Sequence, residues 1–355
     1  MNDLFNMDDI PDGTEPERRV LIVGMNYIGD TLFTTPLIRA MHKSHRRTAV
    51  DVLNGPRGTA MLENNPYIRT VISKPPAGDR AAFDALIARI VQERYDIAIA
   101  ASTSFESARI PYLAKIPVRA GLRTELRSFM FTHSAPRDMR TNIILQMLDI
   151  LKPLGIAHDD SRMDLFISDD EHKEALAVLA KKRIAKEHTL IVHPGATRAQ
   201  KRWPVEYFVK LIRQFNDDQG FPVILIGGKE DEARNAIIAA DCGRAITLDL
   251  TGQLSLRTLA AVIRTAWAFV GNDSAPLHMA SALNVHTVGL FGQTDPVTYG
   301  TLHDGGYNLS MRRACHPIRR FACARITRGC GDNVCMRLVT VDMVMEKLRD
   351  IFRWA

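Results

Sequence analysis

Three segments of this 355-residue chain combine glycines with polar side chains in patterns that suit a phosphorylated ligand. The first is Gly-Met-Asn-Tyr-Ile-Gly-Asp-Thr at 24–31. Its glycines follow a G-x4-G spacing, and no Lys-Ser or Lys-Thr pair follows, so it is neither a dinucleotide fingerprint nor a P-loop. It offers one carboxylate, Asp30, at the start of a predicted helix. Asp30 could face a cleft or could only cap that helix.

The second segment is His-Pro-Gly-Ala-Thr-Arg-Ala-Gln-Lys-Arg-Trp-Pro at 193–204. Its small residues expose backbone N–H groups, and Thr197 adds a hydroxyl. Arg198, Lys201 and Arg202 add positive charge. Amides, a hydroxyl and cations are the groups that bind a diphosphate, so we expect phosphate binding here. Trp203 is predicted to pack rather than to stack on a ligand.

The third segment is Gly-Asn-Asp-Ser-Ala-Pro-Leu-His at 271–278. Asp273 and Ser274 precede a proline that suits the first turn of a helix, whose positive end would point at the ligand. Plain capping is one interpretation, but His278 one turn further on favours a nucleotide or sugar site. Glu230 and Glu232 could hold ribose hydroxyls or could simply form an acidic first helical turn.

Short apolar runs precede all these segments and predict buried parallel strands. In the first half they are 20–23, 49–53, 71–72 and 97–100. A loop at 25–30 leads into a helix that runs to about residue 45, and a second helix covers 81–94. In the second half they are 190–192, 223–226, 246–248, 268–270 and 286–291, with helices at 205–218, 231–240 and 256–264. The alternation predicts two doubly wound α/β domains, whose ligands bind beyond the carboxyl ends of the strands.

The domain boundary is predicted near 160–187. We expect a disordered tail at 1–18, a first domain at 19–165 and a second at 166–340. The terminal helix within 341–355 could return to pack on the first domain.

The charge is unevenly distributed. Residues 1–17 carry six acids and no base, so the rest carries 46 bases against 34 acids, a net charge of +12. A basic body suits a polyanionic partner, or it is only a solvated face. No nucleic-acid motif accompanies it. The sequence contains no apolar run long enough to cross a membrane and does not begin like a signal peptide, so we expect a cytoplasmic protein.

The cysteines leave several interpretations open. Cys315, Cys323, Cys330 and Cys335 cluster near the end of the chain, whereas Cys242 stands alone. In a cytoplasmic chain such a cluster favours thiols or a metal over disulfides, although a disulfide stays open. No C-x-x-C pair occurs, which favours thiols over zinc.

Taken together, the motifs resemble those of glycosyltransferase family 9, the bacterial lipopolysaccharide heptosyltransferases. The matching pieces are 29–36 (G-D-x-L-x-x-x-P), 193–204 (with T-x-x-x-K-x-W-P), 226–228, 250–252, 272–278 and 291–296, in the family's order. The resemblance implies a GT-B fold, in which two Rossmann-like domains face each other across a cleft. It also implies inverting transfer of heptose from ADP-L-glycero-D-manno-heptose to the lipopolysaccharide inner core, at the inner membrane surface.

The resemblance assigns roles residue by residue. Asp30 falls on the general base, and Lys201 on a catalytic contact to the donor diphosphate that Thr197 shares. Asp273 falls on the donor heptose and phosphate region, and the remaining donor residues are Ser274, Ala275, Leu277, His278 and either Glu230 or Glu232. Gly29 and Thr31 fall on the acceptor side. Ala196 replaces a hydroxyl found in some members. No metal or other cofactor is implied.

Two rival functions stay open at this point. A GT-B transferase could use another nucleotide sugar or another acceptor. A catalytically silent GT-B module could serve as a scaffold or sugar sensor, although the presence of Asp30, Lys201 and Asp273 together argues against it. A dehydrogenase is disfavoured because neither first strand is followed by G-x-G-x-x-G.

Overall fold

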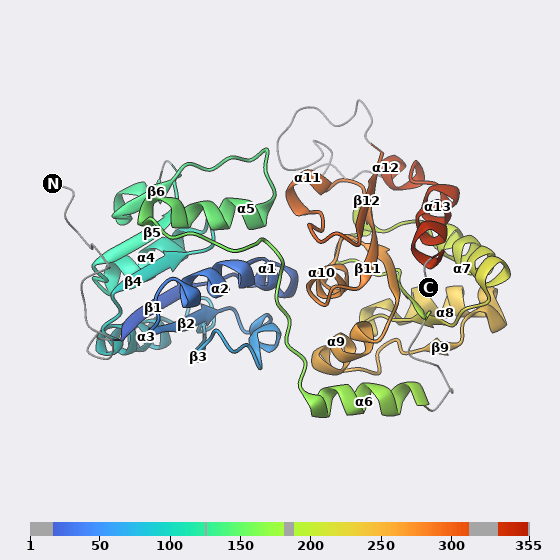
Figure 1. The fold of residues 1–355 in the computed structure, drawn as a ribbon, viewed down its shortest axis with the longest axis horizontal. Coiled ribbons are helices and arrows are strands. Elements are labelled where there is room, and N and C mark those ends of the chain that lie inside the picture. The colour runs from blue at the N-terminus through green and yellow to red at the C-terminus, as the bar shows by residue number, and fades with distance from the viewer. Residues whose placement is uncertain (1–16, 125, 181–187, 312–332, 354–355) are drawn as a thin grey trace.

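The computed structural model describes residues 17–124, 126–180, 188–311 and 333–353. Two parallel six-stranded sheets lie side by side, each flanked by helices (Figure 1). This confirms the predicted doubly wound architecture. The tail predicted at 1–18 falls mostly outside the described residues, and the first strand already begins at Arg18.

The first sheet has the strand order β3-β2-β1-β4-β5-β6. The strands are β1 (Arg18–Val23), β2 (Thr48–Asn54), β3 (Thr70–Ser73), β4 (Ile97–Ala100), β5 (Val118–Leu122) and β6 (His133–Ala135). The helices are α1 (Ile28–Phe33), α2 (Thr35–Lys43), α3 (Arg80–Glu93), α4 (Phe105–Leu113) and α5 (Ile143–Leu148). The strand order reverses between β1 and β4, since β2 and β3 are added on one side of β1 and β4 to β6 on the other. Doubly wound sheets bind ligands at this point.

The second sheet repeats this topology in the order β12-β11-β10-β7-β8-β9. The strands are β7 (Leu190–His193), β8 (Val223–Leu225), β9 (Leu248–Asp249), β10 (Ala268–Asn272), β11 (His286–Phe291) and β12 (Gly306–Ser310). The helices are α6 (Asp169–Ala180), α7 (Val205–Gln219), α8 (Glu232–Cys242), α9 (Leu256–Arg264), α10 (Ala275–Ala282), α11 (Pro296–Tyr299), α12 (Val334–Arg337) and α13 (Val341–Phe352). Here the reversal lies between β7 and β10.

The single helix expected up to residue 45 is two helices, because the chain bends at Thr34. Pro36 has no N–H to donate to the carbonyl of Leu32, and the Thr35 hydroxyl donates to that oxygen instead, at 2.8 Å. The Thr34 hydroxyl similarly donates to the carbonyl of Thr31 at 2.6 Å. The correction matters because Asp30 lies inside the short α1 and not at its cap.

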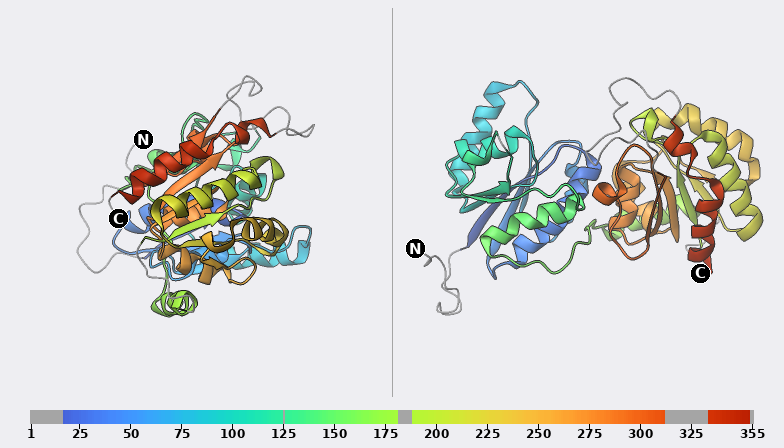
Figure 2. Two further views of the ribbon diagram at one scale, coloured as in Figure 1. Left: turned by 90° about the vertical axis from the view of Figure 1, so that its right-hand side faces the viewer. Right: turned by 90° about the horizontal axis from the view of Figure 1, so that it is seen from above.

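The last helix does not return to the first half. Its apolar face packs with α7 of the second half, where Phe352 contacts Phe215 at a ring-centroid distance of 5.1 Å. Trp203 also faces this segment, since its indole N–H donates to the carbonyl of Val339 at 2.8 Å. The views of Figure 2 show α13 beside the second sheet, where this apolar face is buried.

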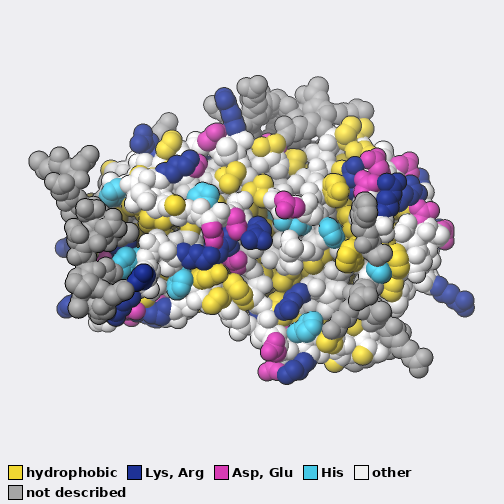
Figure 3. All heavy atoms as spheres, viewed as in Figure 1, with side chains coloured by type: hydrophobic (Ala, Val, Ile, Leu, Met, Phe, Trp, Pro, Cys, Tyr) yellow, Lys and Arg dark blue, Asp and Glu magenta, His cyan; other side chains and the backbone are white. Residues whose placement is uncertain are grey.

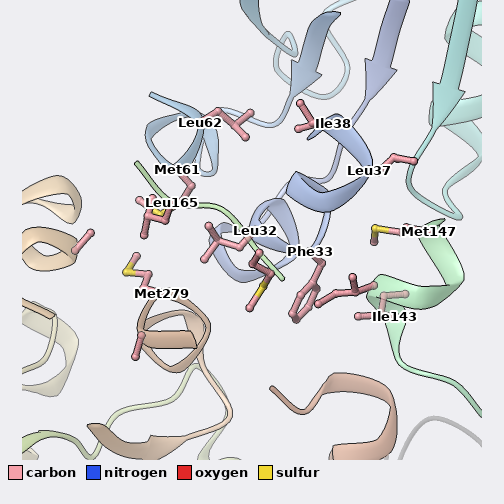
Figure 4. Packing of buried hydrophobic residues seen from close by; sticks show 14 of the residues in the cluster. Leu32, Phe33, Leu37, Ile38, Met61, Leu62, Ile143, Met147, Leu165 and Met279 are labelled. Carbon is pink, nitrogen blue, oxygen red and sulfur yellow. The ribbon is translucent and has the colours of Figure 1, made fainter. Parts of the chain in front are cut away.

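The two halves share part of one hydrophobic core. Figure 4 shows Leu32 and Phe33 of α1, Ile143 of α5 and Met279 of α10 in the same cluster. A buried hydrogen bond reinforces this contact, since the Asn142 side-chain amide donates to the carbonyl of Gly300 at 2.9 Å. The helix that carries Asp30 is therefore packed directly against the second half.

A second contact between the halves is polar. Arg257 of α9 donates to the carbonyl of Ala60 at 3.0 Å and to the carboxylate of Glu171 at 2.6 and 2.7 Å. Glu171 opens α6, at the end of the segment that joins the two halves, and the Arg257 hydrogen bonds lower the pKa of its carboxyl to about 2. Arg257 therefore fixes the crossing of the chain from one half to the other.

Basic, acidic and apolar side chains are interspersed over the face seen in Figure 3. Within the described ranges, no helix is long and apolar enough to cross a bilayer.

Candidate active site

Asp30 lies in the first turn of α1, directly after β1 and the loop that ends at Tyr27. The side chain makes no capping hydrogen bond, because Tyr27 occupies the cap position. A carboxylate in a first helical turn is stabilised by the positive end of the helix dipole. The capping interpretation of Asp30 is therefore wrong, and its carboxylate is available to other partners.

The loop before α1 is held by Lys74, which the sequence motifs do not single out. Its buried ammonium group donates to the carbonyl of Gly24 at 2.9 Å and to the side chain of Asn26 at 3.2 Å. Burial lowers the pKa of Lys74. Lys74 follows β3 directly, so a lysine at a strand end was the available signal.

In the second half, Asn272 at the end of β10 organises the loop that follows β7. Its side-chain amide donates to the carbonyl of Pro194 at 2.8 Å, and its oxygen accepts the backbone N–H of Trp203 at 2.9 Å. Trp203 is fully buried, as expected. These bonds fix the two ends of the loop that carries Lys201.

Lys201 and Asp273 form the central ion pair of the site. The Lys201 ammonium lies 2.5 Å from one carboxylate oxygen of Asp273, and the His278 Nε2 lies 3.3 Å from the other. Burial alone would raise the pKa of Asp273, but His278 and Lys201 together hold it well below its usual range. Asp273 is therefore an anion that holds both the Lys201 ammonium and the His278 ring.

The remaining contacts of the 271–278 segment also exclude simple capping. Ser274 precedes α10, but its hydroxyl donates to the carbonyl of Asn272 at 3.1 Å and lies 3.1 Å from His193 Nδ1. No side-chain cap is formed at α10. The backbone N–H groups of the first turn of α10 are therefore not used by Ser274 or Asp273.

The first half meets this group at the contact between α1 and α10. A Cβ added to Gly29 would lie 3.1 Å from the His278 ring and 3.7 Å from the Cα of Ala275. The Phe33 and His278 rings meet edge to face, with centroids 4.6 Å apart. A larger residue at 29 would crowd the His278 ring, so Gly29 lies at the contact between the two halves. The sequence predicted it only as an acceptor-side position.

Asp30 faces the charged groups of the other half. Burial raises the pKa of Asp30 above that of an ordinary aspartate, and the positive charges of His278 and Lys201 partly offset this rise. The structure thus brings together Gly29, Asp30, Lys201, Asp273, Ser274, Ala275 and His278. A partly desolvated carboxylate opposite a cationic group suits proton transfer on one side and stabilisation of an anion on the other.

Other predicted residues have different surroundings. The buried Thr31 hydroxyl donates to the carbonyl of Tyr27 at 2.8 Å and accepts from the Asn54 amide at 3.0 Å, so it stabilises the first half. Leu277 is buried against Gly289 of β11. Either residue could contact a ligand only through its backbone. Thr197 is exposed in the loop after β7.

Glu230 and Glu232 are both exposed and flank a buried aspartate. That aspartate, Asp231, accepts from Arg234 at 2.7 Å and from the backbone N–H of Gly228 at 3.2 Å. It also lies 3.7 Å from His193. Asp231 therefore fixes the turn after β8 and leaves its two neighbours to solvent or ligand.

Tyr299 is a further residue near Asp30 and Phe33 that the sequence motifs do not single out. Burial and the negative charge of Asp30 both raise its pKa, and its ring lies 6.4 Å from that of Phe33. It closes α11, which directly follows the predicted strand-end turn at 291–296. That turn was the available signal.

Metal-ligating side chains do not gather in groups of three or more within the part of the chain that the structure describes. Cys242 is buried, and burial raises the pKa of its thiol to about 11. Cys335 lies in α12. The predicted cluster cannot be placed as a whole, since Cys315, Cys323 and Cys330 lie outside the described residues.

Comparisons with known proteins agree with this architecture. The sequence model of glycosyltransferase family 9 (heptosyltransferase) matches residues 83–325. Lipopolysaccharide heptosyltransferase 3 of Escherichia coli K12 is 30% identical over 288 residues, covering 77% of this chain and 82% of that protein. Lipooligosaccharide heptosyltransferase 2 of Haemophilus ducreyi is 28% identical over 301 residues, covering 78% and 84%.

A solved structure shows the same fold. The E. coli ADP-heptose lipopolysaccharide heptosyltransferase II superposes with a TM-score of 0.75 at 22% sequence identity, covering 94% of this chain and 98% of that one. The predicted GT-B fold is confirmed.

Proposed function

Because the chain belongs to glycosyltransferase family 9, the heptosyltransferases, we propose that it transfers heptose from ADP-L-glycero-D-manno-heptose to the lipopolysaccharide inner core with inversion. The observation that carries this proposal is the position of Asp30, which follows Gly29 at the contact between α1 and His278 of the opposite half. The charges of His278 and Lys201 act on its carboxylate there. The family match begins at residue 83, so the proposed role of Asp30 depends on this geometry.

The donor would bind to the second half, residues 166–340, and the acceptor to the first, residues 19–165. Lys201, Thr197 and the positive N-terminal end of α10 would contact the diphosphate, and Asp273 the heptose. Ser274, Ala275, His278 and the backbone of Leu277 would surround the nucleotide. Exposed Glu230 or Glu232 would hold the ribose.

The reaction needs one proton acceptor and one anion-stabilising group. Asp30 would take the proton of an acceptor hydroxyl as that oxygen forms the new bond to the anomeric carbon. The bond from that carbon to the donor phosphate breaks on the opposite face, which inverts the configuration. The electron pair leaves with ADP, whose added charge Lys201 and the helix amides would stabilise.

These groups can take the place of a divalent cation, so we propose that no metal is required. An acceptor embedded in the inner leaflet would further place the enzyme at the cytoplasmic face of the inner membrane, as a peripheral protein whose basic body faces anionic lipid.

The pH dependence of the reaction tests the role of Asp30. The base must be ionised, and burial raises its pKa. We therefore expect kcat/KM to fall on the acid side at a higher pH than an ordinary aspartate would impose. A pH–rate profile with a non-titrating acceptor analogue measures this limb. If the acid limb of kcat/KM lay at the pKa of an ordinary aspartate and did not move in Asp30→Glu, the limb would belong to another group.

A nucleotide panel separates the proposal from a transferase that uses another sugar nucleotide. We expect ADP to raise the melting temperature more than UDP, GDP or CMP, with or without EDTA. A ligand at a hundred times its Kd stabilises by about 2.7 kcal/mol. Stabilisation by UDP but not by ADP would rule out the ADP-heptose assignment.

Mass spectrometry of the product formed on a truncated core lipopolysaccharide is the decisive experiment. A mass increase of one heptose, with the anomeric configuration read by NMR, would support both the sugar and the inversion. Donor binding without any product on a panel of core acceptors would favour the silent binding module.

A further inference from the structure

An exposed apolar patch lies on the first half, formed by Phe105, Tyr112 and Leu113 of α4 and by Leu126 and Phe129 of the β5–β6 connection. These are five of the twelve large apolar side chains that the described residues expose. Leu126 is 81% exposed and Phe129 is 70% exposed. A soluble protein rarely gathers such side chains without a partner for them.

The patch is continuous across the two segments. The Tyr112 and Phe129 rings meet edge to face with centroids 6.0 Å apart. Phe105 and Leu126 line one hollow of about 540 Å³ together with Thr103, Thr124, Arg127 and Arg137. The apolar side chains therefore form one surface on two neighbouring segments.

Arg127 makes this surface rigid. It is buried, and its guanidinium donates to the carbonyls of Ser102 at 2.8 Å, Ser104 at 3.0 Å and Leu122 at 3.2 Å. These carbonyls belong to the loop before α4 and to the end of β5. One side chain thus ties together the two segments that carry the patch, which presents its apolar groups already ordered.

Positive charge surrounds the apolar groups. Residues 103–137 contain six Lys and Arg against two acids. Arg109 lies between Phe105 and Tyr112 on α4, and the Arg119 guanidinium lies 5.8 Å from the centroid of the Tyr112 ring. Lys115 and Arg123 are exposed. Aromatic and aliphatic tips beside exposed cations complement an anionic lipid surface, where aromatic rings sit at the headgroup level.

The patch also adjoins the proposed acceptor side of the cleft. The hollow under Phe105 and Leu126 includes Arg137, whose charge acts on Tyr299 of the second half. Tyr299 in turn is influenced by the charge of Asp30. The charges of Arg137, which lines the hollow, and of the proposed base Asp30 therefore both act on Tyr299. An amphiphilic acceptor anchored beneath the patch could present its sugar to Asp30 without leaving the membrane.

We propose that this patch docks the protein on an anionic bilayer, with Leu126 and Phe129 inserted among the headgroups and the surrounding cations on lipid phosphates. The choice of a membrane rests on the proposed function, whose acceptor is an amphiphile, and on the charge complementarity described above. A second copy of the chain and a protein partner are the alternatives that the experiment must distinguish.

Vesicle binding of the full chain tests the proposal. The probes are phosphatidylethanolamine vesicles with phosphatidylglycerol, compared with pure phosphatidylcholine. We expect Leu126→Ser with Phe129→Ser, and separately Lys115→Ala with Arg123→Ala, to weaken binding to anionic vesicles about ten-fold. The control is Val91→Ser with Ile237→Ser, which removes two other exposed apolar side chains, 51% and 54% exposed, and should bind like the wild type.

Two further measurements separate the possible outcomes. The proposal would be overturned if the Leu126→Ser, Phe129→Ser variant bound vesicles like the wild type. It would also be overturned if the wild type were a dimer in lipid-free buffer and this variant a monomer. Transfer to a delipidated, water-soluble acceptor should be unchanged in the variant and impaired only with vesicle-embedded acceptor. Absence of transfer by the wild type would instead contradict the proposed function, whatever the vesicles show.

Discussion

Replacing Asp30 with asparagine should abolish transfer and leave the donor bound. The amide keeps the shape of the side chain but cannot take the acceptor proton, which typically costs about 10²–10⁴ in kcat. Donor contacts come from the second half, so the Kd for ADP should change little. Single-turnover rates and ADP titration calorimetry measure the two effects separately.

The same substitution should raise the melting temperature. Burial raises the pKa of Asp30 in the folded protein, so the folded state binds its proton more tightly than the unfolded state. Tighter proton binding stabilises the folded protein at pH values below the pKa that Asp30 has in the unfolded chain. This stabilisation is lost as the pH rises through the pKa that Asp30 has in the folded protein. At neutral pH the ionised carboxylate therefore costs stability, and the neutral amide removes that cost.

Loss of activity together with a gain of stability would identify Asp30 as a functional residue whose ionised side chain lowers the stability of the fold. The matched control is Asp96→Asn. Asp96 lies at the amino-terminal end of β4, and its carboxylate accepts the backbone N–H of Arg19 at 2.8 Å. That variant should stay active. Full transfer by Asp30→Asn would remove Asp30 from the mechanism.

Most of the strands that the sequence predicted lie inside a sheet, although the edge strands β3 and β9 were also predicted and the interior strand β5 was missed. β1, β7 and β11 are continuous apolar runs because both faces of a central parallel strand are covered by helices. β6, with three residues, and the half-buried β12 lie at sheet edges, so their sequences carry no apolar run. Edge strands of this kind are defined by their neighbours and not by their own composition.

The polar segments of the site were also predictable, since they follow strands that end at one edge of a sheet. Their partners were not. The pairing of Lys201 with Asp273 joins positions 72 residues apart. The approach of Gly29 to His278 depends on how the two halves pack, which no local pattern encodes. Thr31 shows the same limit, because a motif does not reveal whether a side chain faces the ligand or the core.

Replacing Lys201 with alanine should have the second large effect, on donor binding and turnover together. The ammonium group is the cation nearest to Asp273, and we assign it to the donor diphosphate. Loss of a group that stabilises developing negative charge costs about 10²–10³ in kcat. Lys201→Arg keeps the charge and should retain more activity than alanine, whereas Lys210→Ala on the exposed face of α7 should change neither parameter.

The ion pair provides a further check, because Lys201→Ala also leaves the buried Asp273 carboxylate with His278 as its remaining partner among the contacts described above. We expect a stability loss of about 1–3 kcal/mol, below that of a fully buried pair because Lys201 is partly exposed. Adding Asp273→Asn should restore the stability but not the activity. Recovery of transfer in this double variant would show that Lys201 acts only by holding Asp273, and not on the departing diphosphate.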